Sequence, residues 1–211
     1  EYPASSNAIY NSALQRVGAA ISKVANKDSF EWEFVVLDSE EANAFCLPGG
    51  KVAVYSGIFK FVENEAELAT IVSHEVAHAL ARHGGERISW AQVKAVGALG
   101  LQKAGVGTAW EALYGVGTEV GVMLPFSRKH EYEADSIGLI LMARAGYQPQ
   151  AAVHFWEKFS AGRVPGTIEQ WLSTHPAGKD RVNNLQQLMP QAMQEYEKAA
   201  LKRGYGQKMA N

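Results

Sequence analysis

The stretch "ELATIVSHEVAHALARH", residues 67–83, combines a helical pattern of apolar residues with a motif that can bind a metal ion. The apolar residues recur at helical spacing and predict a helix from Glu65 to Arg82. On such a helix His74 and His78, four positions apart, lie about 40° apart around the axis and share one face. Two imidazoles placed in this way can bind one zinc ion, with metal–nitrogen distances of about 2.0–2.1 Å.

Glu75 follows the first histidine and points about 100° away from it around the helix axis. Its carboxylate would lie beside a metal held by the histidines, where it can accept a proton from a water that the metal activates. The other interpretation of this HExxH pattern is an exposed helix face that carries two histidines by chance. The strongly apolar helix argues against it, because two imidazoles are costly to bury without partners.

A catalytic zinc site usually has a third protein ligand and one open position. The stretch "SRKHEYEADSIGL", residues 127–139, supplies candidates, because Glu131 and Asp135 are again four positions apart on a predicted helix. Glu131 could be the third ligand, and Asp135 could accept a hydrogen bond from the far nitrogen of a ligand histidine. Alone this pattern indicates a solvated charged face of a helix. With the HExxH motif upstream, the interpretation as part of a metal site is favoured instead. His130 and Glu133 compete as ligands but face other directions.

The composition is that of a globular protein, and residues 1–211 are expected to form a single domain. The net charge is −2 and no basic run is present, so nucleic acid is not expected as a partner. The one cysteine, Cys46, excludes an internal disulfide framework and is expected to be a small buried residue. His83, near the end of the predicted metal-binding helix, is expected to favour the helix dipole as a cation.

No stretch of the sequence predicts a transmembrane helix. The most apolar part, residues 89–126, is interrupted by charged residues, and its charge-free runs fall short of the ~18 residues that a spanning helix needs. Its glycines predict two helices or a helical hairpin over residues 89–122, whose role the sequence leaves open. Because the chain begins with Glu1 and not Met, we expect a processed product whose missing N-terminal segment could associate with a membrane.

Three short stretches early in the chain predict a small sheet, namely residues 30–37, 43–47 and 51–57, with a turn at "PGG" between the last two. The helices predicted around them span residues 5–24, 65–82, 128–145, 149–161, 178–189 and 190–204. Strands followed by helices indicate an α+β fold, with about three strands and a predominantly helical body.

Together these motifs resemble the gluzincin zinc peptidases, in the branch that contains HtpX, the mitochondrial Oma-type protease and the CAAX prenyl protease. "NAFCLPGGKVAVYSGIF", residues 43–59, looks like the strand–turn–strand before the zinc helix of that branch. "WLSTHPAGKDRV", residues 171–182, looks like its His-Pro segment. The resemblance covers about residues 43–182 and implies a minimal gluzincin, zincin-like fold in a single metallopeptidase domain.

The resemblance implies that His74, His78 and Glu131 bind one Zn²⁺ per chain. It also implies that Glu75 is the general base of a peptidase reaction and that Asp135 orients a ligand histidine. These assignments agree with the geometry expected from the spacing of the residues.

The same resemblance implies an edge strand at Asn43, Ala44 and Phe45 on which an extended substrate is laid by β-addition; a plain core strand is the alternative. In related periplasmic members the histidine that corresponds to His175 can approach the zinc. It could fill the open position and give a latent enzyme, donate a hydrogen bond to an oxyanion during catalysis, or simply cap the following turn. Arg181 could stabilise the same oxyanion or a substrate carboxylate, with a surface salt bridge as the alternative.

We therefore hypothesise a zinc metalloendopeptidase of protein quality control that hydrolyses unfolded or damaged proteins or peptides. The alternative is a latent or non-proteolytic client-binding module in which His175 fills the fourth zinc position. A cytosolic aminopeptidase is a third option, for which the chain offers no evident anchor for a free amino terminus. The resemblance and the missing start lead us to expect the bacterial cell envelope as the location, in the periplasm and with or without a membrane anchor.

Overall fold

The computed structural model describes residues 2–84, 128–160, 168–176 and 178–209. The elements in these ranges are α1 (Ala8–Ala25), β1 (Glu33–Leu37), β2 (Ala44–Leu47), β3 (Lys51–Tyr55), the 3₁₀ helix η1 (Ser56–Phe61), α2 (Glu65–Leu80), α5 (Arg128–Arg144), α6 (Gln150–Ser160), α7 (Glu169–Thr174) and α8 (Lys179–Lys198). The predicted α+β fold with a small sheet and a helical body is confirmed. The helices predicted for residues 89–122 lie outside the described residues.

The sheet has the order β1-β3-β2, with β1 parallel and β2 antiparallel to the central strand β3. The N-terminal segment covers the outer edge of β1, because Ser5 N–H donates to the Val36 carbonyl and Asp38 N–H donates to the Pro3 carbonyl, both at 2.8 Å. Within the described ranges, no strand pairs with the outer edge of β2. Among the residues that the structure describes, one edge of the sheet is therefore protected and the other is open.

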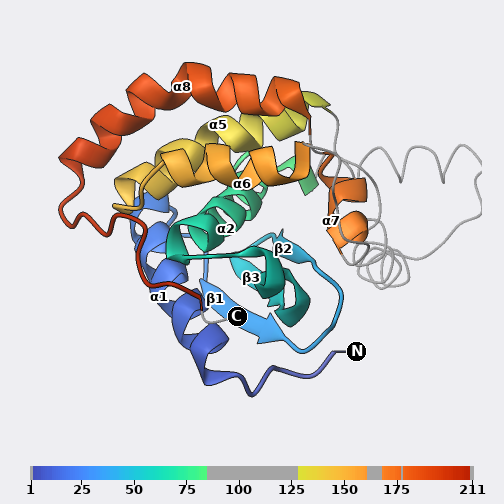
Figure 1. Cartoon of the computed structure of the whole chain (residues 1–211). Helices are drawn as coiled ribbons and strands as arrows, with labels where there is room; N and C mark the ends of the chain where they lie inside the picture. Colours follow the sequence, from blue (N-terminus) through green and yellow to red (C-terminus); the bar gives the residue numbers. More distant parts are fainter. Residues whose placement is uncertain (1, 85–127, 161–167, 177, 210–211) are drawn as a thin grey trace, which may run out of the picture.

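The helix α2 lies at the centre of the molecule. Figure 1 shows successive layers, with the sheet, then α2, then α5 and α6, and α8 on the outside. Every residue of α2 from Glu65 to His78 is buried, as expected of a helix that is contacted on all sides. Residues on this helix are therefore held in a fixed position and shielded from water.

The C-terminal tail fixes the start of α2. Asn64 caps the helix through its Oδ1, which accepts a hydrogen bond from the backbone N–H of Glu67 at 3.1 Å. The first N–H groups of a helix have no partner within it, and the Gln207 carbonyl accepts one of them, that of Glu65, at 2.9 Å. A segment more than 140 residues away in the sequence thus takes part in placing the central helix.

The end of the chain differs from the sequence prediction. Helices were predicted for residues 178–189 and 190–204, but α8 runs without a break through Pro190 and ends at Lys198. A proline inside a helix removes the hydrogen bond to the carbonyl four residues earlier, here that of Gln186. Pro190 and Gln186 are exposed, so water can take the place of the lost donor. The short helix α7 was not predicted.

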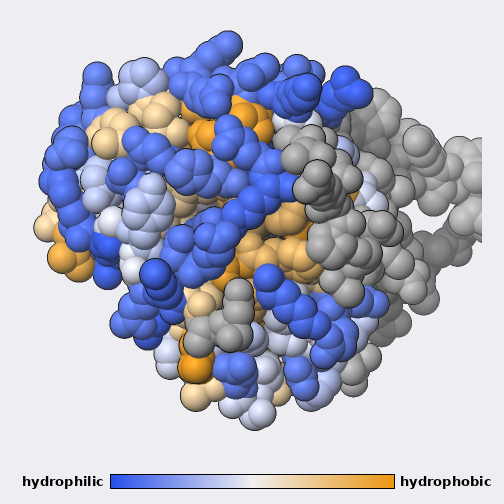
Figure 2. All heavy atoms as spheres, viewed as in Figure 1, coloured by the Kyte–Doolittle hydropathy of each residue, from blue (hydrophilic) through white to orange (hydrophobic). Residues whose placement is uncertain are grey.

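The character of the surface and of the helices can be described for the placed residues. Hydrophilic residues cover most of the face shown in Figure 2, with apolar residues in smaller patches between them. Among the helices in the described ranges, none combines the length and the apolar character that crossing a bilayer requires.

Candidate metal centre

Two helices meet closely at the predicted metal site. α2 carries His74 and His78, and α5 carries Glu131 and Asp135. Gly138 allows the close approach, because a Cβ atom at this position would lie 3.1 Å from the backbone nitrogen of His74. Because Gly138 has no side chain, α5 packs closely on α2. The two histidines of α2 therefore face the two carboxylates of α5.

The ligand atoms of His74, His78, Glu131 and His175 lie within 4.8 Å of one another, and all four residues are buried. The Nε2 atoms of His74 and His78 are 3.0 Å apart. The Glu131 carboxylate oxygens lie 3.5 Å from Nε2 of His74 and 3.3 Å from Nε2 of His78. A tetrahedral zinc with bonds of about 2.0–2.1 Å separates neighbouring ligand atoms by about 3.3 Å. The cluster can hold a metal ion, and its imidazoles and carboxylate are donors that suit zinc.

Asp135 lies between the metal cluster and a buried arginine. Its Oδ1 is 3.1 Å from Nδ1 of His74, the nitrogen that faces away from the cluster. Arg181 donates two hydrogen bonds to the Asp135 carboxylate, at 2.7 and 2.6 Å. Although burial opposes ionisation, the Arg181 charge holds the pKa of Asp135 below its usual value. Asp135 is thus placed to orient His74 as a carboxylate.

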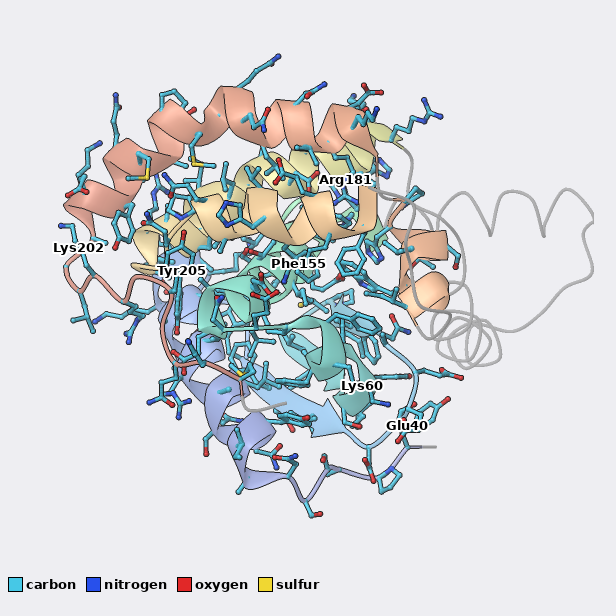
Figure 3. All side chains as sticks on the ribbon, in the orientation of Figure 1. Glu40, Lys60, Phe155, Arg181, Lys202 and Tyr205 are labelled. Atoms are coloured by element: carbon cyan, nitrogen blue, oxygen red, sulfur yellow. The ribbon has the colours of Figure 1, made fainter. Side chains whose placement is uncertain are left out.

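Arg181 is buried, at 4% exposure, so the surface salt bridge that the sequence left open is not formed. It lies at the N-terminal end of α8, inside the helical layers (Figure 3). Its Nη1 is 2.9 Å from Oε2 of Glu131, and its guanidinium carbon is 3.6 Å from the ring centre of Trp156. These contacts favour a role in positioning Asp135 and Glu131, while its role at an oxyanion stays a prediction.

Glu75 lies beside the cluster in a buried position. Its Oε1 accepts a hydrogen bond from Nε1 of Trp171 at 3.4 Å, and Nε2 of His175 lies at the same distance. Burial raises the pKa of Glu75 to about 7. A carboxyl group with a pKa near neutrality can both take and return a proton. Trp171 was not singled out in the sequence, because it lies on the unpredicted helix α7.

His175 follows the end of α7 and reaches the cluster. Its Nδ1 lies 2.8 Å from Oγ1 of Thr174 and 3.3 Å from the carbonyl oxygen of Trp171. Because a carbonyl oxygen only accepts, these contacts favour a hydrogen on Nδ1 and a lone pair on Nε2, the atom nearest Glu75. Burial also lowers the pKa of His175 well below its usual value, so the ring is neutral. The structure brings His175 to the predicted ligands, and its role as inhibitor or helper stays a prediction.

His83 is a further residue at the site, and its expected positive charge at the end of the helix stays a prediction. Its ring is buried, with Nδ1 2.9 Å from Nδ1 of His78. The ring of His130 stacks on it at a centroid distance of 4.3 Å. The five-residue spacing from His78 to His83 does not signal a contact on a regular helix, which is why the pattern missed it.

The predicted substrate strand lies at the open edge of the sheet. The Asn43 carbonyl accepts a hydrogen bond from Tyr55 N–H at 2.8 Å, so Asn43 faces β3. In an antiparallel pair the direction alternates, so Phe45 also faces β3, whereas Ala44 and Cys46 face outward. The N–H of Ala44 donates a hydrogen bond to Oδ1 of Asn43 at 2.9 Å. The groups left at the edge are the Ala44 carbonyl and both backbone groups of Cys46, a residue not predicted for this role.

Comparison with known proteins places this site in a recognised family. A model of the family described as peptidase family M48 matches residues 8–189, which include the metal cluster and the edge strand. The chain is 37% identical over 185 residues to the mitochondrial metalloendopeptidase OMA1 of Schizosaccharomyces pombe, a match that covers 87% of this chain and 54% of that protein.

Two further relatives match over a similar length of this chain. The mitochondrial metalloendopeptidase OMA1 of Arabidopsis thaliana is 37% identical over 183 residues, which cover 84% of this chain and 36% of that protein. The beta-barrel assembly-enhancing protease of Escherichia coli is 32% identical over 198 residues, which cover 87% of this chain and 40% of that protein. The chain thus spans about half the length of these relatives or less.

The relatives correct one expectation from the sequence. The bacterial cell envelope was expected as the location, but several relatives are named mitochondrial. That expectation is wrong, because the residues that carried the resemblance report the chemistry of the site and are shared across compartments. The compartment to which a protein is directed is encoded in separate targeting segments.

Proposed function

Because the chain belongs to peptidase family M48, we propose that it is a zinc-dependent endopeptidase acting on protein or peptide substrates. The observation that supports this most strongly is the buried cluster of His74, His78 and Glu131, with the carboxylate of Glu75 beside it. A structural zinc site would have no need of that carboxylate. We further propose that the cluster holds one zinc ion per chain and that residues 1–211 act as one catalytic domain.

In this proposal the zinc ion, Glu75 and Asp135 have separate tasks. Zinc bound there would polarise a scissile carbonyl and lower the pKa of a water molecule toward about 7. Glu75 accepts the proton of the attacking water and passes it to the leaving amine, a double role that its pKa of about 7 supports. Asp135, held by Arg181, keeps the ring of His74 in place.

The substrate would be an extended segment that adds to the open edge of the sheet. The outward carbonyl of Ala44 and the outward N–H and carbonyl of Cys46 can pair with a peptide backbone. This pairing reads the backbone and few side chains, so it favours unfolded or damaged proteins as substrates. The N-terminal segment at β1 supports the assignment, because it pairs with the outer edge of β1 at Val36 and Asp38, whereas no described strand pairs with the outer edge of β2.

His175 supports a second state of the same site. Its neutral Nε2 lies among the ligand atoms of the cluster and could fill the fourth zinc position. The protein would then be latent, or would hold a client without cutting it, until His175 moves away. This state uses the same zinc ligands as the active one and differs only in the group at the open position.

The endopeptidase proposal is tested by cleavage of unfolded casein at matched zinc content. Glu75→Gln should lower the cleavage rate roughly 10²–10⁴-fold without loss of zinc, because it removes the proton acceptor and no ligand. Glu40→Gln is the matched control, since it changes an exposed glutamate on a loop distant from the cluster (Figure 3) and should leave the rate unchanged. Equal rates for wild type and Glu75→Gln would overturn the proposal.

His175→Ala separates the active from the latent state. If His175 fills the open position, this variant should cleave casein faster than the wild type. A loss of activity would instead assign His175 a task in the reaction. If neither the wild type nor His175→Ala cleaves casein with one zinc bound, the client-binding module is favoured and the endopeptidase proposal fails.

A further inference from the structure

His83 stands directly behind one of the two metal-facing histidines. The Nε2 of His78 points at the metal cluster, and its Nδ1 lies 2.9 Å from Nδ1 of His83. Both rings are buried, at 3% and 2% exposure. The second ring nitrogen of a metal-bound histidine is almost always held by a carboxylate, a carbonyl or a water. Here an imidazole occupies that place.

The backbone holds His83 in this position by an unusual turn. α2 ends at Leu80, and Arg82 adopts a left-handed conformation with φ of 60°, which residues other than glycine rarely take. This turn directs the chain back toward the helix, so that His83 reaches the side of His78. A conformation of this kind costs of order 1 kcal/mol or more and persists where the surroundings require it.

The hydrogens of the three groups can be assigned from the contacts. A neutral histidine that offers Nε2 to a metal carries its hydrogen on Nδ1, so His78 must donate toward His83. The Nδ1 of His83 must then accept, which places its hydrogen on Nε2. That atom lies 3.4 Å from Oε2 of Glu133, a carboxylate oxygen that can accept it. The donors thus run in one direction, from His78 to His83 and from His83 to Glu133.

We propose that His83 is the positioning residue for the zinc ligand His78: its Nδ1 accepts the hydrogen of His78 Nδ1 and so fixes the ring and the tautomer that present Nε2 to the metal. Glu133 fixes the tautomer of His83 in turn, and the stacked ring of His130 limits its rotation. The inference rests on the proposed zinc site and assigns a task to residues outside the HExxH and ExxxD motifs.

The test measures zinc affinity by competition with a chromophoric chelator. His83→Phe and His83→Leu both remove the acceptor, and the phenyl ring keeps a surface for His130 to stack on. Both should bind zinc roughly 10–100-fold more weakly than the wild type. His83→Asn should keep the affinity within about threefold, because its Oδ1 stands where Nδ1 of the histidine stood and still accepts. His154→Phe, at an exposed histidine of α6, is the control and should change nothing.

A spectrum adds a readout that simple packing would not move. The visible absorption bands of the cobalt(II)-loaded protein report the ligand geometry, so they should shift in His83→Phe and return toward the wild-type bands in His83→Asn. Wild-type affinity in both His83→Phe and His83→Leu would overturn the inference. So would an Asn variant as weak as the other two, because the ring would then serve packing alone.

The same titration separates this inference from the proposed function. If the wild type does not bind zinc, or His78→Ala binds it as tightly as the wild type, the proposed zinc site fails. If these two proteins behave as proposed and His83→Phe still binds normally, only the role of His83 fails.

Discussion

The two histidines of the metal cluster are supported in different ways. His74 is backed by the carboxylate of Asp135, which is held by the guanidinium of Arg181, and all three side chains are at most 4% exposed. His78 is backed by the ring of His83, and behind it stands Glu133, whose side chain is 50% exposed. One support is a buried ion pair between residues of α5 and α8, and the other is a hydrogen-bonded chain that ends at a half-exposed carboxylate.

This difference sets the charge of each ring before a metal binds. Burial opposes protonation of His74, but the carboxylates of Asp135 and Glu131 outweigh it and raise the pKa of His74 to about 9. Burial lowers the pKa of His78 to about 3, and Glu131 only partly offsets this. At neutral pH the metal-free site therefore holds its proton on His74, and His78 is ready to bind.

The largest expected effect comes from breaking the buried support. Asp135→Asn leaves the charge of Arg181 in the interior with Glu131 as its remaining ion-pair partner among the described residues. Removing one partner of a buried ion pair costs about 3–5 kcal/mol of folding stability, and the remaining Glu131 places the expected loss near the lower end, about 3 kcal/mol. Urea unfolding of the metal-free protein measures it.

The matched control for this change is Asp180→Asn, at an exposed aspartate in the first turn of α8. It should change the free energy of unfolding by less than about 0.5 kcal/mol. Similar losses of unfolding free energy in the two variants would show that the ion pair at Asp135 does not stabilise the fold more than an exposed aspartate does.

An intermediate effect is expected from the pH dependence of zinc binding. Zinc must displace the proton of His74, which is bound below a pKa of about 9, so the affinity should rise with pH and level off near pH 9. Glu75 is already mostly ionised at pH 7.5, and from there the zinc affinity should rise nearly tenfold in the first pH unit and more slowly toward pH 9. Calorimetry in buffers of different ionisation enthalpy should find about one proton released at pH 7.5. A flat affinity over this range would contradict the assignment of the proton to His74.

The smallest effect is expected at the exposed end of the second support. Glu133→Gln keeps an oxygen that can accept from Nε2 of His83, and half of the Glu133 side chain is already in water. The free energy of unfolding should change by less than about 1 kcal/mol and the zinc affinity by a few-fold at most. Urea unfolding and chelator competition, run beside Asp135→Asn, measure both. A loss as large as that of Asp135→Asn would mean that the two supports are equally strong.

The sequence predicted the parts of the site that depend on helical spacing. His74 and His78, like Glu131 and Asp135, are four positions apart, and the geometry of a helix places such pairs on one face whatever surrounds them. His83 escaped prediction because its position depends on the left-handed turn at Arg82, and no sequence signal marks an arginine for that conformation.

The fold shows a similar division. The strands and the central helix follow from local patterns, and their bounds agree with the prediction within a few residues. The parallel pairing of β1 with β3, the short helix α7 and the capping of α2 by the tail at Gln207 depend on contacts between distant segments. The continuity of α8 through Pro190 depends on its exposed surroundings. None of these features leaves a periodic pattern in the sequence.

The central proposal is a zinc ion held by His74, His78 and Glu131, and X-ray absorption at the zinc edge tests it most directly. With one zinc per chain, the spectrum should show nitrogen and oxygen ligands at about 2.0–2.1 Å with the scattering pattern of imidazoles. His78→Ala should change that pattern. A thiolate ligand at about 2.3 Å, for which Cys46 is the one cysteine of the chain, or a spectrum that His78→Ala leaves unchanged, would contradict the site.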